Sequence, residues 1–154
     1  MMQKGKFRIL FVCHGNICRS TMAHYVMLHL VREAGRERDF VIDSAACTRD
    51  ALGMGAHSGT RKVLAKRGIY CGDHRARLLR RSDADAFDYI IGMDQENLAD
   101  MRRILGGAFK DKASLLLDWT HEYRDVADPW YTDDFETTFD DVWRGCTALL
   151  GQLT

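Results

Sequence analysis

The sequence has no net charge, a single proline and no long hydrophobic run. Its 22 Lys and Arg residues balance its 22 Asp and Glu residues, so no overall field would attract nucleic acid or an anionic membrane. No stretch is long enough to cross a bilayer, and the apolar run 9–13 is too short for the hydrophobic part of a signal peptide. We therefore expect a cytoplasmic protein that neither inserts into membranes nor binds nucleic acid, so any anion site must be local.

A regular set of paired cysteines is also lacking. The five cysteines are odd in number and irregular in spacing, which disfavours the disulfide framework of a small secreted protein and favours reduced thiols. Cys146 lies on the apolar stripe of a helical pattern, so we expect it to be buried as a small hydrophobic residue. Cys47 and Cys71 have no partner at a recognisable spacing.

Short apolar runs alternate with segments of helical spacing, and no repeat or linker divides the 154 residues. We expect strands at 7–12, 40–42, 89–92 and 113–117, helices at 20–33, 59–67 and 95–105, a helical turn capped by Ser82, and a last helix from near Asp133. This alternation predicts a single α/β domain, 1–154, of three layers, in which helices cover both faces of a four-stranded parallel sheet. In such a sheet, ligands bind beyond the carboxyl ends of the strands.

The stretch CHGNICRS lies between the first expected strand and the first expected helix. Gly15 and Asn16 belong to the residue types that reach left-handed conformations most easily, which lets successive amides point inward. Inward amides and a helix N-terminus form an anion site, and the Arg19 guanidinium adds a planar fork suited to two phosphate oxygens. The same field favours the thiolate form of Cys13 at the base of the loop.

Four interpretations of this loop compete. A nucleotide P-loop needs Gly-Lys-Ser/Thr at the helix entry, where this chain has Arg19 and Ser20. A zinc site could use Cys13, His14 and Cys18, but no second ligand pair follows. Two half-buried cysteines in a tight turn would explain neither the arginine nor the Gly-Asn pair. We favour the fourth interpretation, Cys-x5-Arg-Ser, in which thiolate, amides and guanidinium converge on one tetrahedral dianion.

The fourth interpretation implies nucleophilic chemistry at phosphorus. The Cys13 thiolate would attack in line and form a cysteinyl phosphate, while Arg19 and the loop amides stabilise the charge that spreads over the equatorial oxygens. The Ser20 hydroxyl can stabilise the sulfur as thiolate and as leaving group. The departing oxygen then needs a proton donor.

The only proline marks a candidate for that donor. Pro129 biases Asp128 toward an extended conformation, so the Asp128 carboxyl can project from a loop. Trp130 and Tyr131 follow and can form the wall of a pocket for an aryl group. A carboxyl beside apolar rings and across from a thiolate tends to stay protonated, as a general acid requires. A turn with a helix-capping aspartate and surface aromatics is the alternative.

Together these segments resemble the low-molecular-weight protein tyrosine phosphatase family over nearly the whole chain. The matching motifs are Val12-Cys13-x-Gly-Asn-Ile-Cys-Arg-Ser20, Asp43-Ser44-Ala45, His74-x-Ala-Arg77, Phe87-Asp-Tyr-Ile90, Met93-Asp94, Asp128-Pro-Trp-Tyr131 and Asp134-Phe-Glu136. The resemblance implies a four-stranded parallel sheet and hydrolysis of protein phosphotyrosine and small aryl phosphates. It also implies a phosphotyrosine protein as partner, no metal or other cofactor, and a monomer or weak dimer.

The resemblance implies roles for individual residues as well. Cys13 would be the nucleophile, Arg19 the phosphate clamp, and Asp128 the acid that later activates water. Asn16, Ser44 and His74 would brace the loop, although sequence physics alone favours an exposed imidazole at His74. Cys18 would be able to form a disulfide with Cys13 and protect it from irreversible oxidation. The residues implied to bind phosphate or substrate are His14, Gly15, Asn16, Ile17, Cys18, Ser20, Trp130 and Tyr131.

Some positions depart from the family pattern. Thr21 stands where the family usually has proline, and the segment 47–50 lacks the aromatic pocket wall that often follows Asp-Ser-Ala. His14 occupies a variable rim position. A thioredoxin-coupled arsenate reductase on the same fold would need two further relay cysteines, and Cys71 has no close partner. A phosphoarginine phosphatase tends to have a smaller polar residue in place of Ile17.

Overall fold

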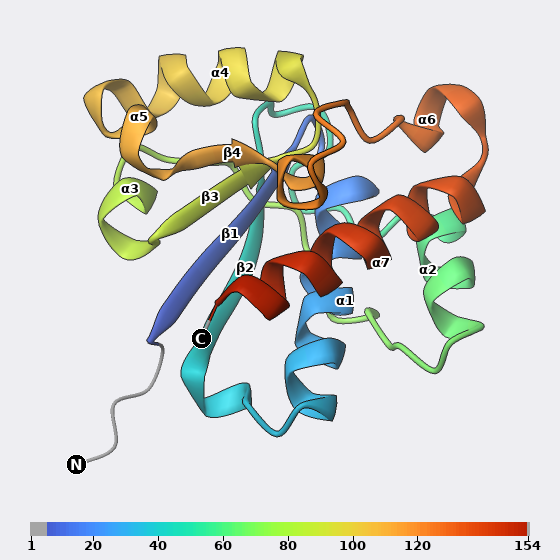
Figure 1. The fold of residues 1–154 in the computed structure, drawn as a ribbon. Coiled ribbons are helices and arrows are strands. Elements are labelled where there is room, and N and C mark those ends of the chain that lie inside the picture. Colours follow the sequence, from blue (N-terminus) through green and yellow to red (C-terminus); the bar gives the residue numbers. More distant parts are fainter. Residues whose placement is uncertain (1–5, 154) are drawn as a thin grey trace.

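A four-stranded parallel sheet forms the centre of the computed structural model, which describes residues 6–153 (Figure 1). Its strands are β1 Phe7–Cys13, β2 Phe40–Ala46, β3 Tyr89–Gly92 and β4 Ala113–Leu115, in the order β2-β1-β3-β4. The α/β parallel architecture expected from the sequence is therefore confirmed. Residues 1–5 and 154 of the expected domain 1–154 lie outside the described residues.

Helices cover both faces of this sheet (Figure 1). They are α1 Arg19–Glu33, α2 Ser58–Ala65, α3 Asp83–Ala86, α4 Gln95–Leu105, α5 Phe109–Lys112, α6 Pro129–Thr132 and α7 Phe135–Gln152, with 3-10 turns Glu37–Asp39, Gly106–Ala108 and Leu116–Thr120. The central strand β1 shows why both faces are covered. Its odd-numbered side chains join the core under α1 and α7, whereas Leu10 and Val12 join the core under α4, because successive side chains of a strand point to opposite faces.

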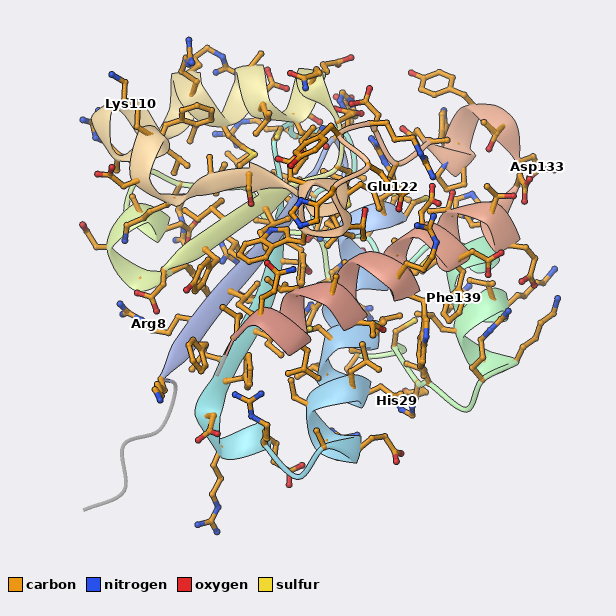
Figure 2. The ribbon with its side chains drawn as sticks, in the orientation of Figure 1. Arg8, His29, Lys110, Glu122, Asp133 and Phe139 are labelled. Atoms are coloured by element: carbon orange, nitrogen blue, oxygen red, sulfur yellow. The ribbon has the colours of Figure 1, made fainter. Side chains whose placement is uncertain are left out.

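The last helix packs through the stripe that its sequence predicts. Phe139, Val142, Cys146 and Leu149 of α7 are buried, so Cys146 is the buried hydrophobic residue that was expected. Burial raises the pKa of its thiol. The ring centroid of Trp143 on α7 lies 5.7 Å from that of Phe139 on the same helix and 6.1 Å from that of His29 on α1; Figure 2 marks Phe139 and His29. The contact between Trp143 and His29 helps to join the two helices.

Three local expectations are wrong. The second strand continues to Ala46 rather than ending at 42. The fourth strand ends at Leu115 rather than at 117, because the Asp118 carboxylate accepts a hydrogen bond from the Leu115 amide and the chain turns into a 3-10 segment. Ser82 does not cap α3 through its side chain; its own backbone is already helical, and the Asp83 carboxylate accepts from the Arg80 amide instead. Leu115 pairs with Gly92 at the end of β3, so β4 ends at the same edge of the sheet as β3.

The strand order places a switch point beside the end of β1. The chain runs from β1 to β2 on one side of it, and then crosses to β3 on the other side. The loop after β1 and the loop after β3 therefore diverge at the same edge and leave a crevice between them, where ligands bind in sheets of this type.

Candidate active site

The loop between β1 and α1 turns at one left-handed residue. Asn16 has a φ of 58°, as expected, whereas Gly15 is not among the residues of positive φ, so the expectation of a left-handed turn fails there. Asn16 is fully buried, and both its side-chain amide and its carbonyl oxygen make hydrogen bonds. The short polar side chain of asparagine tolerates this conformation better than most residues do, and the hydrogen bonds that Asn16 makes show why it is useful here.

Those bonds tie the loop to two neighbouring segments. The Asn16 side-chain amide donates to Ser20 Oγ at 2.8 Å, and its Oδ1 accepts from the Arg77 backbone amide at 3.3 Å. His74 Nε2 lies 2.6 Å from the Asn16 carbonyl oxygen, to which it donates. His74 is buried, and burial lowers the pKa of its imidazole. The expectation of an exposed histidine, which sequence physics alone favoured, is therefore wrong.

Ser44 does not brace Asn16 in the way the family resemblance implied. Its hydroxyl lies 2.8 Å from His24 Nδ1, and among the described residues no hydrogen bond joins Ser44 to Asn16. His24 stacks on the Tyr25 ring at 4.5 Å, and its own ring stands edge-on to that of His74 at 6.3 Å. Ser44 thus reaches the loop indirectly, through two imidazoles. Burial lowers the pKa of His24 to about 4, so it is neutral around neutral pH.

Cys13 lies at the base of the loop beside the start of α1. Its Sγ is 3.0 Å from Ser20 Oγ and 3.4 Å from the Ser20 backbone amide, which donates to it. Because Ser20 Oγ already accepts from Asn16, the serine hydroxyl hydrogen is free to donate to the sulfur. The N-terminus of α1 has no side-chain cap, so its unpaired amides also face this region. All of these groups stabilise negative charge on Cys13.

The second cysteine of the loop has a different environment. Burial, and then the charge of Cys13, raises the pKa of Cys18 to about 12, so Cys18 remains a thiol at neutral pH. All five cysteines are free and buried, and the pair Cys13 and Cys18 is not joined. Burial likewise raises the pKa values of Cys47 and Cys71. The two cysteines of the loop are thus chemically unequal.

Arg19 is held rigidly below the pocket. Its Nη1 donates to Asp94 Oδ2 at 2.7 Å and to the Val126 carbonyl oxygen at 2.9 Å, while Nη2 is 3.4 Å from Asp128 Oδ2. Its Nε is the one buried side-chain nitrogen or oxygen in residues 6–153 without a hydrogen-bond partner. Burial alone would lower the pKa of Arg19, but the charges of Cys13, Asp94 and Asp128 raise it overall. One edge of the guanidinium is thus available for two oxygens of an anion.

The sequence analysis gave no role to Asp94, which orients that guanidinium. Asp94 follows β3 directly, and its Oδ1 also accepts from the Asn97 amide to cap α4. Carboxyl ends of neighbouring parallel strands meet at one edge of a sheet, so a carboxylate directly after β3 was a detectable signal.

Asp128 caps a short helix and also faces the arginine of the loop. Its Oδ1 accepts from the Trp130 amide at 3.0 Å and caps α6, with Pro129 at the first helical position. Its Oδ2 faces Arg19. Two further bonds position the segment: the Val126 amide donates to the Met93 carbonyl oxygen at 2.8 Å, and Thr138 Oγ1 donates to the Ala127 carbonyl oxygen at 3.1 Å.

One pocket of about 480 Å³ brings most of the predicted residues together. The predicted residues that line it are Cys13, His14, Gly15, Ile17, Cys18, Arg19, Asp128, Trp130 and Tyr131, while Asn16, Ser20, His74 and Ser44 are not among its lining residues. The lining also includes Asp50, Met54 and His57, which the sequence analysis had not assigned to the site.

His57 is the missed residue with the most contacts. Its ring centroid lies 5.8 Å from that of Trp130 and 5.0 Å from that of Phe135, and its Nδ1 accepts from the Gly59 amide to cap α2. It therefore joins α2 to the segment that carries Asp128. The sequence offered no signal for this contact, because a histidine before a helix is compatible with many environments.

Residues 6–153 show neither a cluster of metal ligands nor a membrane-spanning helix. No group of three or more His, Cys, Asp or Glu side chains there is arranged to hold a metal ion. Within the same range, no helix combines the length and apolar character needed to cross a bilayer.

Known proteins share both this sequence and this fold. The family model for low molecular weight phosphotyrosine protein phosphatases matches residues 8–154. The chain is 37% identical over 147 residues to the low molecular weight protein-tyrosine-phosphatase YfkJ of Bacillus subtilis, and the match covers 94% of each chain. It is 34% identical over 155 residues to the low molecular weight phosphotyrosine protein phosphatase of Rattus norvegicus, and that match covers 97% of this chain and 98% of the rat protein.

Solved structures agree with these matches. The crystal structure of YfkJ superposes with a TM-score of 0.92 over 96% of this chain and 94% of that one, at 37% identity. A protein tyrosine phosphatase from Entamoeba histolytica, solved with Hepes in its active site, superposes with a TM-score of 0.88 at 32% identity over 96% of each chain. This chain therefore belongs to the low molecular weight phosphotyrosine protein phosphatase family and is an enzyme of the protein-tyrosine-phosphatase class.

Proposed function

We propose that the enzyme hydrolyses phosphotyrosine in proteins, and small aryl phosphates, through a cysteinyl-phosphate intermediate formed on Cys13. One observation carries this proposal: Cys13 Sγ, the unpartnered Nε edge of Arg19 and the Asp128 carboxyl surround the floor of a single pocket. Nucleophile, anion clamp and proton donor are the three parts that phosphoryl transfer to a thiolate requires.

In the first step the Cys13 thiolate attacks phosphorus, so that a sulfur–phosphorus bond forms as the bond to the tyrosine oxygen breaks. The electron pair goes to the departing oxygen, which takes a proton from Asp128. Arg19 and the amides at the start of α1 stabilise the charge on the equatorial oxygens.

In the second step water attacks the phosphorus of the intermediate. The Asp128 carboxylate accepts a proton from this water, the sulfur–phosphorus bond breaks, and Cys13 leaves as a thiolate with the phosphate released. The Ser20 hydroxyl, 3.0 Å from Sγ, stabilises that leaving thiolate. Both steps use the same groups in reversed roles, so no metal or cofactor enters the proposed reaction.

The pocket walls support an aryl substrate. Ile17, Met54 and Trp130 line the pocket above the polar floor, and a planar ring can bury its apolar faces against them. Phosphoarginine has a polar guanidino group in place of that ring, and this group would lie against the apolar side chains of Ile17, Met54 and Trp130. An arsenate reductase would need accessible relay cysteines, whereas Cys47 and Cys71 are buried and do not line the pocket.

Turnover measurements on wild type and single variants test the proposal. Wild type should release phosphate from p-nitrophenyl phosphate and from a phosphotyrosine peptide. Cys13→Ser should lower kcat by at least about 10⁴, because the serine alcohol is a far weaker nucleophile. Cys71→Ser is the matched control, since it changes a buried thiol away from the pocket, and it should keep activity.

A rapid-quench experiment with ³²P-labelled substrate should trap a phosphoenzyme in wild type and none in Cys13→Ser. Activity of Cys13→Ser close to wild type, or phosphate release without a labelled intermediate, would contradict the mechanism. Thioredoxin-dependent arsenate reduction, or faster turnover of phosphoarginine than of phosphotyrosine, would support the corresponding rival function.

We also propose that residues 1–154 form one domain that acts in the cytoplasm as a monomer or weak dimer. The five free cysteines support a reducing compartment, and the family match from 8 to 154 supports a single domain. Sedimentation analysis across a range of concentrations would test the oligomeric state, and a stable tetramer would contradict it.

A further inference from the structure

The mouth of the pocket has two unlike sides. On one side, the apolar residues Met54, Trp130 and Tyr131 have 55%, 63% and 84% of their surface exposed. On the other side lie His14 and Asp50, with Glu96 of α4 next to them. The ring of a bound phosphotyrosine would extend from the rim to the floor, so residues next to it in a peptide would contact these two sides.

The polar side is built on backbone bonds that fix it to the phosphate loop. The Cys47 amide donates to the Cys13 carbonyl oxygen at 2.9 Å, and the Thr48 amide and hydroxyl both donate to the His14 carbonyl oxygen at 3.1 Å. Thr48 Oγ1 in turn accepts from the Asp50 amide. The position of Asp50 therefore depends on the same loop that holds Cys13, and the wall is present before any substrate arrives.

His14 is shared between two exposed carboxylates. Its Nε2 is 2.7 Å from Asp50 Oδ2 and its Nδ1 is 4.0 Å from Glu96 Oε1. The side chains of Asp50 and Glu96 are 71% and 77% exposed. A single imidazole cannot satisfy four carboxylate oxygens, so both groups retain acceptor capacity toward the solvent at the pocket mouth.

Negative charge predominates on this side. Asp125 is also exposed there, and its Oδ1 accepts from the Gln95 amide, next to Glu96. Of the nearby arginines, Arg19 is engaged below the floor and Arg124 pairs with Asp141 and Glu122. Arg49 lies on the same turn as Asp50, so three carboxylates face one arginine and one histidine.

The floor of the same pocket offers a site for an anion. Arg19 Nε, buried and unpartnered, borders the pocket floor and is suited to a phosphate dianion. A phosphotyrosine bound there would bring its backbone to the level of Asp50 and Glu96. A lysine or arginine beside it could replace His14 as their partner and gain charge-assisted hydrogen bonds.

We propose that the polar wall formed by His14, Asp50 and Glu96 selects phosphotyrosine segments with a lysine or arginine adjacent to the phosphotyrosine. This inference rests on the proposed phosphotyrosine phosphatase activity and names the substrate class within it. The apolar side of the mouth then contacts the remainder of the peptide, and Asp50 takes the place of an aromatic wall.

Matched phosphotyrosine hexapeptides test this proposal. One peptide carries lysine on both sides of the phosphotyrosine, the second carries glutamate, and p-nitrophenyl phosphate reports the chemistry alone. In wild type at low ionic strength, kcat/KM for the lysine peptide should exceed that for the glutamate peptide by about fivefold or more, since each exposed charge pair changes affinity by a factor of about two to five. The ratio should shrink in 0.5 M salt, where the Debye length is only a few ångströms.

The variant Asp50→Asn/Glu96→Gln should bring the ratio of the two peptides close to one. Asp111→Asn removes an exposed carboxylate from α5, at the opposite end of the molecule from α6 (Figure 1), and should keep the wild-type ratio. If circular dichroism shows that the double variant folds poorly, Glu96→Gln alone replaces it. The Glu96 side chain is mostly exposed, so this single variant should fold, and it should still lower the ratio of the two peptides.

The outcomes distinguish failure of the proposed phosphatase function from failure of the proposed peptide preference. Lack of turnover of p-nitrophenyl phosphate by wild type would overturn the proposed function itself. Turnover of p-nitrophenyl phosphate and of both peptides with equal efficiency, or a preference for the glutamate peptide, would overturn only the inference about the polar wall. A lysine preference that persists unchanged in the double variant would also overturn it, since other groups would then be responsible.

Discussion

Two segments of this enzyme supply groups to the pocket, and they are fixed in different ways. The phosphate loop, 13–19, and the adjoining Ser20 hold Cys13, Asn16 and Ser20 buried, each with side-chain hydrogen-bond partners. The acid segment, 125–133, carries Asp128 half-buried between the exposed Ala127 and the buried Pro129. It is held by helix caps, a few hydrogen bonds and the ring of His57.

The difference indicates that the loop is the more rigid of the two segments and the acid segment the more adaptable. Buried polar networks are costly when incomplete and rigid when complete, so the loop keeps one geometry for the dianion. Most residues of the acid segment are exposed, and exposed segments open at lower free energy, so we expect this segment to adapt to substrates of different size. We expect substitutions in the loop to affect both folding and catalysis, and those in the acid segment to affect catalysis alone.

Among the substitutions that test this comparison, we expect the largest effect from Asp128→Asn in the acid segment. Asparagine can still cap α6 for the Trp130 amide, so the fold should persist, but it cannot donate a carboxyl proton. We expect kcat to fall by about 10²–10⁴. The loss should be larger for aryl phosphates with more basic leaving groups, which a series of substituted phenyl phosphates would measure. A loss of less than tenfold across that series would sink the assignment of Asp128 as the acid.

The next effect is expected from Asn16→Ala in the loop. It removes the bonds to Ser20 and Arg77 and places alanine in a left-handed conformation, so we expect a loss of about 2–4 kcal/mol in the free energy of unfolding. Urea denaturation would measure it. Asn16→Gly is the matched control, because it loses the same bonds without the backbone strain, and should be about 1 kcal/mol more stable than Asn16→Ala.

Trp130→Ala provides the corresponding test in the acid segment. Its ring is mostly exposed, so stability should change by less than the Asn16 variants do. Equal destabilisation by the two alanine variants would contradict the contrast between the two segments.

The smallest effect is expected in the pH dependence of the free energy of unfolding, through His24, which lies between Ser44 and the loop. Burial lowers the pKa of His24 to about 4; Asp43 acts in the opposite sense, while His74 and Arg77 reinforce the lowering. Because the unfolded chain binds a proton at its ordinary pKa near 6.5, this contribution to stability is complete above that pH and is lost as the pH falls from about 6.5 to about 4. We expect the loss to be about 1–3 kcal/mol.

The variant His24→Gln isolates this contribution, since other groups also titrate in this range. Glutamine keeps a hydrogen-bonding side chain near Ser44 but does not titrate, so its free energy of unfolding should depend less steeply on pH than that of wild type. Identical slopes for the two proteins between pH 6.5 and 4 would refute the role of His24.

The groups that the sequence revealed share a short-range signal. Cys13 and Arg19 belong to one loop at the end of a recognisable strand, and Asp128 precedes the only proline. Those signals depend on local backbone preferences, which involve only a few neighbouring residues. The sequence analysis could not assign Asp50 or His57 in the same way, because their neighbours in the pocket are far away along the chain.

Ser44 and Gly15 show where prediction from the sequence stops. The resemblance implied that Ser44 braces the loop together with Asn16 and His74, and an intervening histidine of α1 takes the Ser44 hydroxyl as partner. Gly15 was expected to be left-handed together with Asn16, but the turn needs one such residue. In both cases the residue types were compatible with either arrangement, and packing around α1 and the loop decided between them.

The amino-acid sequence by itself determined the alternation of strands and helices, the edge of the sheet where ligands bind, and the nucleophile and acid proposed here, since periodicity and local backbone preferences are written in neighbouring residues. Only the tertiary structure decided that Asp94 orients Arg19, that His24 stands between Ser44 and the loop, and that His14 and Asp50 form one wall of the pocket. Hydrogen bonds and ion pairs depend on distances of about 3 Å between atoms, and only the packed sheet and its helices bring such distant residues that close.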